Sequence, residues 1–207
     1  MKLLIAVPCM DYLDVAFVRS LTALVQKLTR DGADFELRLR DGSLVYCARD
    51  DLSFEAFHEG FTHVLWLDSD IVFDDDIFDR LYKTGKSFVS GVCRSRRRSF
   101  GYCVYRNLEP AEKHTSIKDS LFMIDGCGFA AVLIETKILK DVWDANNETC
   151  FTPTQDFGED LQFCFRARKL GYRIYCEPSV KCGHVGRVVV RPEDDIGPLN
   201  EYQKDAR

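Results

Sequence analysis

Apolar and polar residues follow two different spacings along the first part of this chain. Residues 3–8 form an uninterrupted apolar run, and the next apolar positions recur at helical spacing: Phe17, Leu21, Leu24, Val25 and Leu28. The uninterrupted run is typical of a buried strand, and the helical spacing is typical of an amphipathic helix. We therefore expect the chain to begin with a strand followed by a helix.

The alternation of strand and helix continues to residue 93. Residues 35–40 alternate before an Asp-Gly turn, residues 44–60 have helical character, and residues 63–67 form another apolar run. A helix is expected after the acids at 74–76, ending near Gly85, and a strand at 87–93. The order strand-helix-strand-helix-strand favours a parallel sheet with right-handed crossovers.

The pattern changes in the second half, which we expect to be mixed. Strands are expected at 99–105 and 121–124 around a polar loop at 109–118, and a tight polar break at 125–128 precedes an apolar strand at 129–134. A helix is expected at 159–170, where Gly171 ends it, and strands at 172–176 and near Val180. The polar segment at about 188–207 has little to bury and is expected to be a mobile tail or a lid.

Length and charge limit the kind of protein. A chain of 207 residues suits one domain, and a net charge of -5 argues against a nucleic-acid partner. The arginines between Arg94 and Arg98 form one basic patch, either a solvated loop or a binding element. The apolar start stops at Pro8, too short for a signal peptide or a membrane span, so we expect a soluble protein that is not exported.

The nine cysteines indicate a reducing compartment. Their number is odd, no C-x-x-C pair occurs, and most lie inside apolar runs. Cysteine as a small hydrophobic residue in the cytoplasm explains this better than disulfides do. Cys176, Cys182 and His184 have zinc-like spacing but lack a fourth nearby ligand, which makes zinc a weak alternative.

Two acids, Asp68 and Asp70, stand directly after the apolar run at 63–67. In extended backbone both side chains point the same way and can reach one divalent cation. Magnesium or manganese held there would neutralise the phosphates of a nucleotide and stabilise a leaving diphosphate. The alternative is a strand end whose acids merely cap the next loop.

Two further places carry candidate chemistry. Gly158 precedes Glu159 and Asp160 in the first turn of the expected helix, where carboxylates either balance the helix dipole or include a base that deprotonates a hydroxyl. His184 lies between Gly183 and Gly186 and is either a turn histidine or a metal ligand.

In their order, these elements resemble the GT-A glycosyltransferases of the family-2-like type, which use nucleotide sugars. The resemblance covers about residues 3–187 and rests on five motifs: Ala6-Val7-Pro8, Asp68-Ser69-Asp70, Asp125-Gly126-Cys127-Gly128, Gly158-Glu159-Asp160 and His184-x-Gly186. It implies an α/β fold, a single GT-A (Rossmann-like) domain with a mixed, mainly parallel central sheet flanked by helices. The nucleotide-binding half would span about 1–93 and the acceptor and metal half about 94–187. The compact size suggests a bacterial or large-DNA-virus source.

The resemblance also implies roles for individual residues. Asp68, Asp70 and His184 would hold Mn²⁺ or Mg²⁺, and Glu159 and Asp160 would be catalytic, with Asp160 the acceptor base if the reaction inverts the anomeric centre. The donor, expected to be a UDP-sugar, and the acceptor, a carbohydrate or other hydroxyl compound, would be bound by Val7, Pro8, Arg49, Asp68, Asp125, Gly126, Gly128 and Arg187.

Several alternatives stay open at this point. A retaining transferase on the same scaffold would leave Asp160 as a positioning group. A haloacid-dehalogenase-like phosphatase would use Asp68 as nucleophile and Asp70 as acid or base, but needs that motif on its first strand. A sugar nucleotidyltransferase would need a glycine-rich basic loop after the first strand, where this chain has Val7-Pro8-Cys9-Met10. A sugar-binding module with a structural cation would give Glu159 and Asp160 no task.

Overall fold

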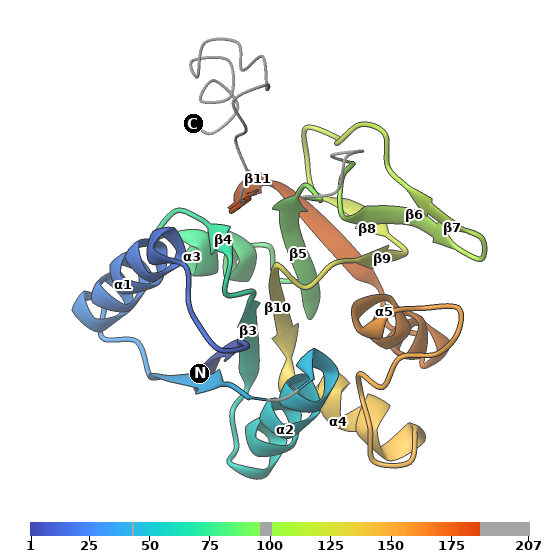
Figure 1. Ribbon diagram of the computed structural model, residues 1–207, viewed down its shortest axis with the longest axis horizontal. Coiled ribbons are helices and arrows are strands. Elements are labelled where there is room, and N and C mark those ends of the chain that lie inside the picture. The colour runs from blue at the N-terminus through green and yellow to red at the C-terminus, as the bar shows by residue number, and fades with distance from the viewer. Residues whose placement is uncertain (43, 96–100, 187–207) are drawn as a thin grey trace, which may run out of the picture.

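The computed structural model describes residues 1–42, 44–95 and 101–186 (Figure 1). In the first half the elements are β1 (Leu3–Pro8), α1 (Val15–Arg30), β2 (Phe35–Arg40), α2 (Val45–His58), β3 (His63–Leu67), β4 (Ile71–Val72), α3 (Ile77–Lys83) and β5 (Phe88–Cys93). These elements confirm the predicted alternation, and only the short β4 was not expected.

The second half contains β6 (Val104–Leu108), β7 (Ala111–Lys113), β8 (Phe122–Ile124), β9 (Gly126–Cys127), β10 (Ala131–Glu135), α4 (Thr136–Ala145), α5 (Glu159–Lys169) and β11 (Ile174–His184). The sequence did not predict α4. Its buried Ile138, Leu139 and Val142 have the helical spacing that would have indicated it.

One large sheet carries the fold. Its strands lie in the order β2-β1-β3-β10-β5-β11-β4, and β8 pairs with β11 beside this path. The pairs β1-β2, β1-β3 and β5-β11 are parallel, whereas β10 is antiparallel to both β3 and β5. The five strands β2, β1, β3, β5 and β11 therefore share one direction, and β10 from the second half is inserted among them.

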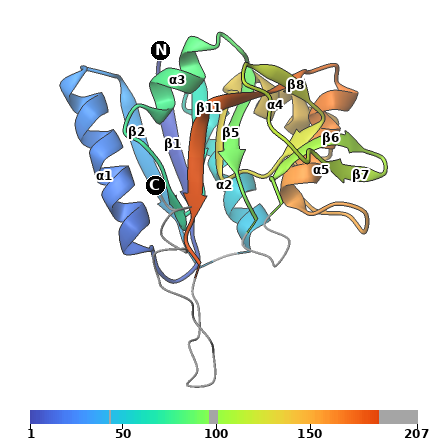
Figure 2. The same ribbon diagram turned by 90° about the horizontal axis from the view of Figure 1, so that it is seen from above.

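Helices cover both faces of this sheet, as Figures 1 and 2 show from two directions. On one face α1 and α3 pack over one apolar cluster, and on the other α2, α4 and α5 pack over a second. Alternate residues of β1 enter the two clusters: Leu4 and Ala6 one, Leu3, Ile5 and Val7 the other. A strand buried on both faces needs no polar alternation, which explains the uninterrupted apolar run.

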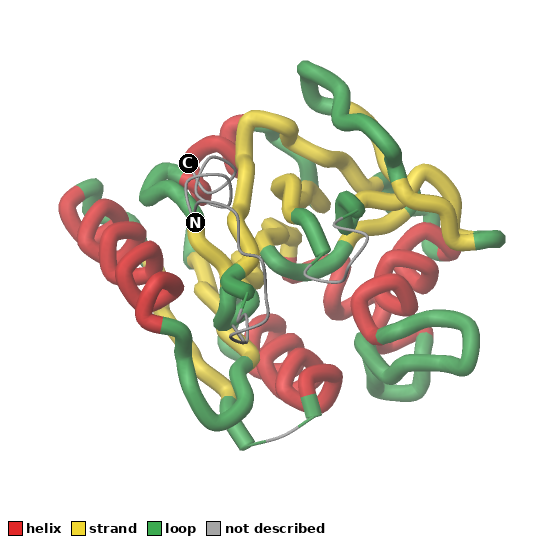
Figure 3. Tube along the Cα trace, turned by 45° about the horizontal axis from the view of Figure 1, so that its top comes forward, coloured by secondary structure: helices red, strands yellow, loops and turns green. Residues whose placement is uncertain are grey.

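A second, antiparallel sheet lies beside the first in the order β7-β6-β9. The tube in Figure 3 shows its strands projecting from the large sheet. It corrects two expectations: residues 111–113 are β7 within the expected polar loop, and residues 126–127 are β9 rather than a tight break. Gly126 and Cys127 are buried because β9 pairs with β6 and packs against α5.

Three other expectations have mixed outcomes. β11 is one strand with a register irregularity between Cys176 and Lys181, where two strands were predicted. Of the strand predicted at 99–105, residues 99–100 lie outside the described residues and β6 begins only at Val104. Arg187 and the tail at 188–207 also lie outside the described residues. Within the described ranges, no helix combines the length and hydropathy that a membrane crossing requires.

Candidate metal and transfer site

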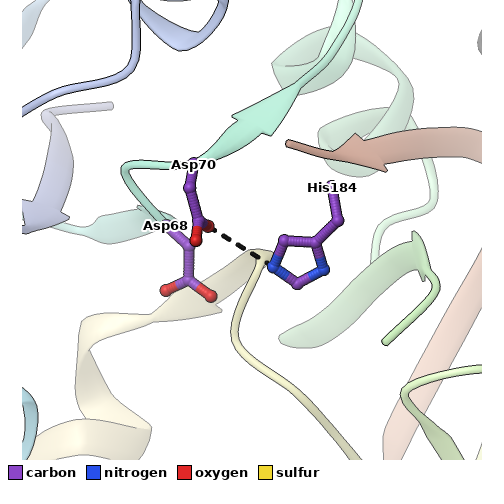
Figure 4. A group of neighbouring side chains, drawn as sticks. All are labelled: Asp68, Asp70 and His184. Carbon is purple, nitrogen blue, oxygen red and sulfur yellow. Dashed lines mark ion pairs between the residues drawn. The ribbon is translucent and has the colours of Figure 1, made fainter. Parts of the chain in front are cut away.

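Three predicted ligands meet at one corner of the sheet. Asp68 follows β3, Asp70 precedes β4, and His184 ends β11; their nearest ligand atoms all lie within 4.8 Å of one another (Figure 4). β4 and β11 pair antiparallel, with His184 opposite Ile71, and the Val185 amide donates to the Asp70 carbonyl at 2.8 Å. The short strand β4 therefore fixes the distance between segments that are more than 110 residues apart.

The imidazole of His184 is oriented by its surroundings. Its Nδ1 lies 2.7 Å from the carbonyl oxygen of Arg94 and 3.3 Å from Sγ of Cys93, while Nε2 lies 3.3 Å from Oδ1 of Asp70. The hydrogen bonds to Asp70 and then to Cys93 raise the pKa of His184 to about 10. Because the Arg94 carbonyl holds Nδ1–H, a divalent cation would bind at Nε2 and displace the proton that faces Asp70, the usual arrangement around a ligating histidine.

The donor set fits a divalent cation. Two carboxylates and one imidazole nitrogen suit manganese or magnesium, which prefer oxygen ligands with few nitrogen ligands. All three side chains are partly exposed, so a cation and a phosphate can reach them. The structure does not group His184 with Cys176 and Cys182 among its described residues.

Arg49 lies beneath the metal corner. It is 1 % exposed, and its Nη2 donates to Oδ1 of Asp68 at 2.8 Å. The guanidinium carbon lies 5.1–5.7 Å from the ring centroids of Trp66, Phe129 and Phe151. Nε and Nη1 have no hydrogen-bond partner among the described residues. Arg49 therefore supplies a buried positive charge that holds Asp68 in place.

Asp160 lies in the first turn of α5, where its carboxylate interacts electrostatically with Arg49 and Asp68 of this corner. Burial raises the pKa of Asp160 to about 6; Glu159 and Asp68 also raise it, and Arg49 lowers it. A carboxyl with a pKa near neutrality is suited to accepting a proton from a hydroxyl. The environment of Asp160 is thus compatible with the role of a base that the sequence predicted for it.

The segment 125–128 packs against the start of α5 and against its side chains. A Cβ built on Gly128 would lie 3.4 Å from Oδ2 of Asp160 and 3.3 Å from Cβ of Cys103, so glycine allows the backbone to pass close to the carboxylate. Gly126 is buried in β9, and a Cβ there would lie 2.9 Å from Leu108. Asp125 forms an ion pair with Arg168 of α5 at 3.2 Å.

The remaining predicted residues lie at the end of β1. Val7 is fully buried in the cluster under α1 and α3, and Pro8 ends the strand and is also buried. Arg187 belongs to the residues that the structure does not describe. The structure therefore brings together Arg49, Asp68, Asp70, Asp160 and His184, and places Val7 and Gly126 in packing positions.

Two contributors were missed by the sequence. The carboxylate of Asp50 accepts hydrogen bonds from Thr149 Oγ1 and from the amides of Cys150 and Phe151, which fixes the loop that leads to α5. The Arg94 carbonyl orients His184. A pattern of side chains cannot indicate the role of a backbone carbonyl. The sequence does show Asp50 next to Arg49, but it does not show that Asp50 binds the loop at 149–151.

An open cleft of about 1280 Å³ adjoins the metal corner at His184. We call it the side cleft; it is lined by residues 72–74, 92–94, 102, 115–119, 178–179 and 181–185. Neither Asp68 nor Asp160 lines it. The side cleft is therefore a separate space that shares only one edge with the metal corner.

The fold matches known structures, although the sequence does not. No protein-family model matches the chain, and no curated protein matches it. Among solved structures, the chain is similar to A197 from STIV, with a TM-score of 0.61, 19 % identity, and coverage of 95 % of this chain and 100 % of that one.

Two structures of glycosyltransferases are also similar. GalNAc-T7 with UDP, GalNAc and Mn²⁺ matches with a TM-score of 0.58 and 9 % identity over 97 % of this chain, which spans 47 % of that protein. The catalytic domain of Drosophila beta1,4-galactosyltransferase 7 with xylobiose matches with a TM-score of 0.57 and 12 % identity, over all of this chain and 79 % of that one. The chain thus has the GT-A glycosyltransferase fold, as predicted.

Proposed function

We propose that this protein is a metal-dependent glycosyltransferase. It would move a sugar from a nucleoside diphosphate sugar, expected to be UDP-linked, to a hydroxyl group of a carbohydrate or other acceptor. The observation that carries the proposal is the meeting of Asp68, Asp70 and His184 within 4.8 Å, on a fold shared with transferases. The similar GalNAc-T7 structure contains UDP and Mn²⁺, which supports the same ligands here.

Each residue has a task in this proposal. Asp68, Asp70 and Nε2 of His184 would hold Mn²⁺ or Mg²⁺, which supplies positive charge for the leaving diphosphate. Arg49 keeps the Asp68 carboxylate in place from below. Asp160 takes the proton from the acceptor hydroxyl, and Gly128 lets the backbone pass close to its carboxylate.

The inverting mechanism is preferred because of Asp160. A carboxyl whose pKa is about 6 is ionised at neutral pH and still basic enough to accept a proton. In a retaining enzyme the same carboxylate would only position a substrate. Two further points stay predictions. One is the division of the chain near residue 93 into a nucleotide half and an acceptor half. The other is the cytoplasmic location, with which the nine free cysteines are compatible.

The phosphatase alternative lacks its structural context. That class needs the D-x-D motif on its first strand, whereas here it follows β3, and β10 pairs antiparallel with that strand. A sugar-binding module would not require the partly buried carboxyl of Asp160 with its raised pKa.

Release of UDP from a panel of UDP-sugars, with Mn²⁺ and mixed acceptors, tests the proposal. The protein should release UDP faster in the presence of one acceptor class, and Asp160→Asn should keep UDP binding while release falls by about 10²–10⁴-fold. Unchanged release by Asp160→Asn would remove Asp160 as the base. Hydrolysis of p-nitrophenyl phosphate without any response to a nucleotide would favour the phosphatase instead.

A further inference from the structure

The side cleft is shaped by an irregular stretch of β11. The register with β5 shifts between Cys176 and Lys181, and Pro178 and Ser179 line the cleft where the strand is displaced. Arg80 of α3 supports this wall, because its Nη1 donates to the Ser179 carbonyl at 2.8 Å. The backbone of β11 at Ser179 therefore forms one wall of the cleft, and α3 holds this wall in place through Arg80.

The charges around the side cleft do not balance. Arg94, Lys118 and Lys181 line it, as do the acids Asp74 and Asp119. Asp74 forms an ion pair with Arg80 at 2.7 Å, and Arg80 also pairs with Asp76. The three lining cations therefore outnumber the two lining acids even without counting Arg80.

The cations, in contrast, have no acidic partner within residues 1–42, 44–95 and 101–186. Arg94 donates to the Tyr102 hydroxyl at 2.9 Å and lies over its ring, and the Lys118 amino group lies 5.4 Å from the centroid of Phe122. No ion pair joins Lys181 to an acid there. In a protein of net charge -5, the cleft is therefore locally positive.

The lining also contains groups that suit a sugar. Tyr102 presents an aromatic ring, and Thr115, Ser116 and Ser179 contribute hydroxyl groups at the same cleft. A few polar groups among apolar walls fix the orientation of a small ligand. The cleft touches His184, so a ligand in it lies next to the proposed metal corner.

We propose that the side cleft binds an anionic carbohydrate through a carboxylate or phosphate group held by Arg94, Lys118 and Lys181. Because Asp160 does not line the side cleft, this is a second carbohydrate site beside the metal corner, and its binding does not depend on the proposed transfer reaction. Arg94 then acts as a binding residue of the basic patch between Arg94 and Arg98, the alternative to a solvated loop.

Titrations of the ¹⁵N-labelled protein, followed by amide chemical shifts, test this directly. The ligands are glucuronate, glucose 6-phosphate, glucose and inorganic phosphate, all without Mn²⁺ or a nucleotide. The acidic sugars should shift amides of residues 115–119 and 181–183 and bind at least fivefold more tightly than glucose. Raising the salt from 50 to 500 mM should weaken them, because exposed charges are screened.

Charge reversal gives the matched comparison. The double variant Lys118→Glu, Lys181→Glu should lose at least fivefold in affinity for both acidic sugars, whereas Lys140→Glu on α4 should not change it. Equal binding of glucose and glucuronate, or full affinity in the double variant, would overturn the proposal. Inorganic phosphate binding as tightly as glucose 6-phosphate would show an anion site that does not recognise sugar, which also overturns it.

The result is separable from the proposed function. The double variant should keep its stabilisation by UDP with Mn²⁺, since neither lysine belongs to the metal corner. If UDP and Mn²⁺ fail to stabilise the parent protein while glucuronate still shifts the cleft amides, the transferase proposal fails and the acidic-sugar site stands.

Discussion

Replacing Asp160 with asparagine should make the protein more stable at neutral pH while it loses transfer activity. The carboxyl is held beside Glu159 and Asp68, and burial raises its pKa to about 6 from an ordinary 3.8. Its ionised form is therefore less favourable in the folded protein than in the unfolded chain. Asparagine has the same size and carries no charge.

The expected magnitude follows from this difference in pKa. Between pH 4 and 6 the folded state binds the proton more tightly, so the stability of the parent falls as pH rises through that range. Above pH 6 the loss is complete and amounts to about 3 kcal/mol, at 1.36 kcal/mol for each tenfold change in proton affinity. Asp160→Asn should lack this fall: it should resemble the parent at pH 4 and exceed it by up to about 3 kcal/mol at pH 8.

Urea unfolding of both proteins at pH 4 and pH 8 measures the effect. Asp156→Asn, in the exposed loop before α5, is the matched control and should stay within about 0.5 kcal/mol of the parent. If Asp160 only balanced the dipole of α5, the asparagine variant would instead be less stable by about 0.3–1 kcal/mol. That opposite sign at pH 8 would refute the argument for a functional carboxylate.

Three further outcomes are expected. The transfer rate should fall about tenfold for each pH unit below 6, as Asp160 takes up its proton, and a flat profile from pH 5 to 8 would contradict this. His184→Ala should weaken Mn²⁺ binding by at least tenfold in a calorimetric titration, whereas His58→Ala, on the exposed end of α2, should not. Asp50→Ala should lower the free energy of unfolding by about 2–4 kcal/mol, because three hydrogen bonds to the loop 149–151 are lost; a change below 0.5 kcal/mol would show that they do not hold the loop.

The sequence predicted the elements of the first half well because their patterns are strong. β1 and β3 are uninterrupted apolar runs, α1 has helical apolar spacing and β2 alternates. The order of these elements fixes which strands are neighbours through right-handed crossovers. The insertion of β10 between β3 and β5 was not predictable, because pairing between distant strands leaves no local pattern. Short strands such as β9 are defined by their partners rather than by their own residues.

The sequence predicted the proposed metal ligands of the candidate site, but it did not predict the contacts that hold the neighbouring side chains in place. Asp68, Asp70 and His184 were recognisable from motif order, and the structure brings them together. The burial of Arg49 among aromatic rings depends on Phe129 and Phe151, which are 80 and more residues away along the chain. Such contacts arise only once the sheet and the loop before α5 have formed.

The proposed function requires that Asp70 belong to a cation site that binds a nucleoside diphosphate. A thermal melt with UDP, with and without Mn²⁺, tests it on the parent, on Asp70→Ala, and on Asp75→Ala, an exposed acid nearby that serves as the control. Because ligands that bind only the folded state raise the melting temperature, the parent and the control should be stabilised by UDP only when Mn²⁺ is present, and Asp70→Ala should not respond. An equal Mn²⁺-dependent rise in Asp70→Ala would contradict the account.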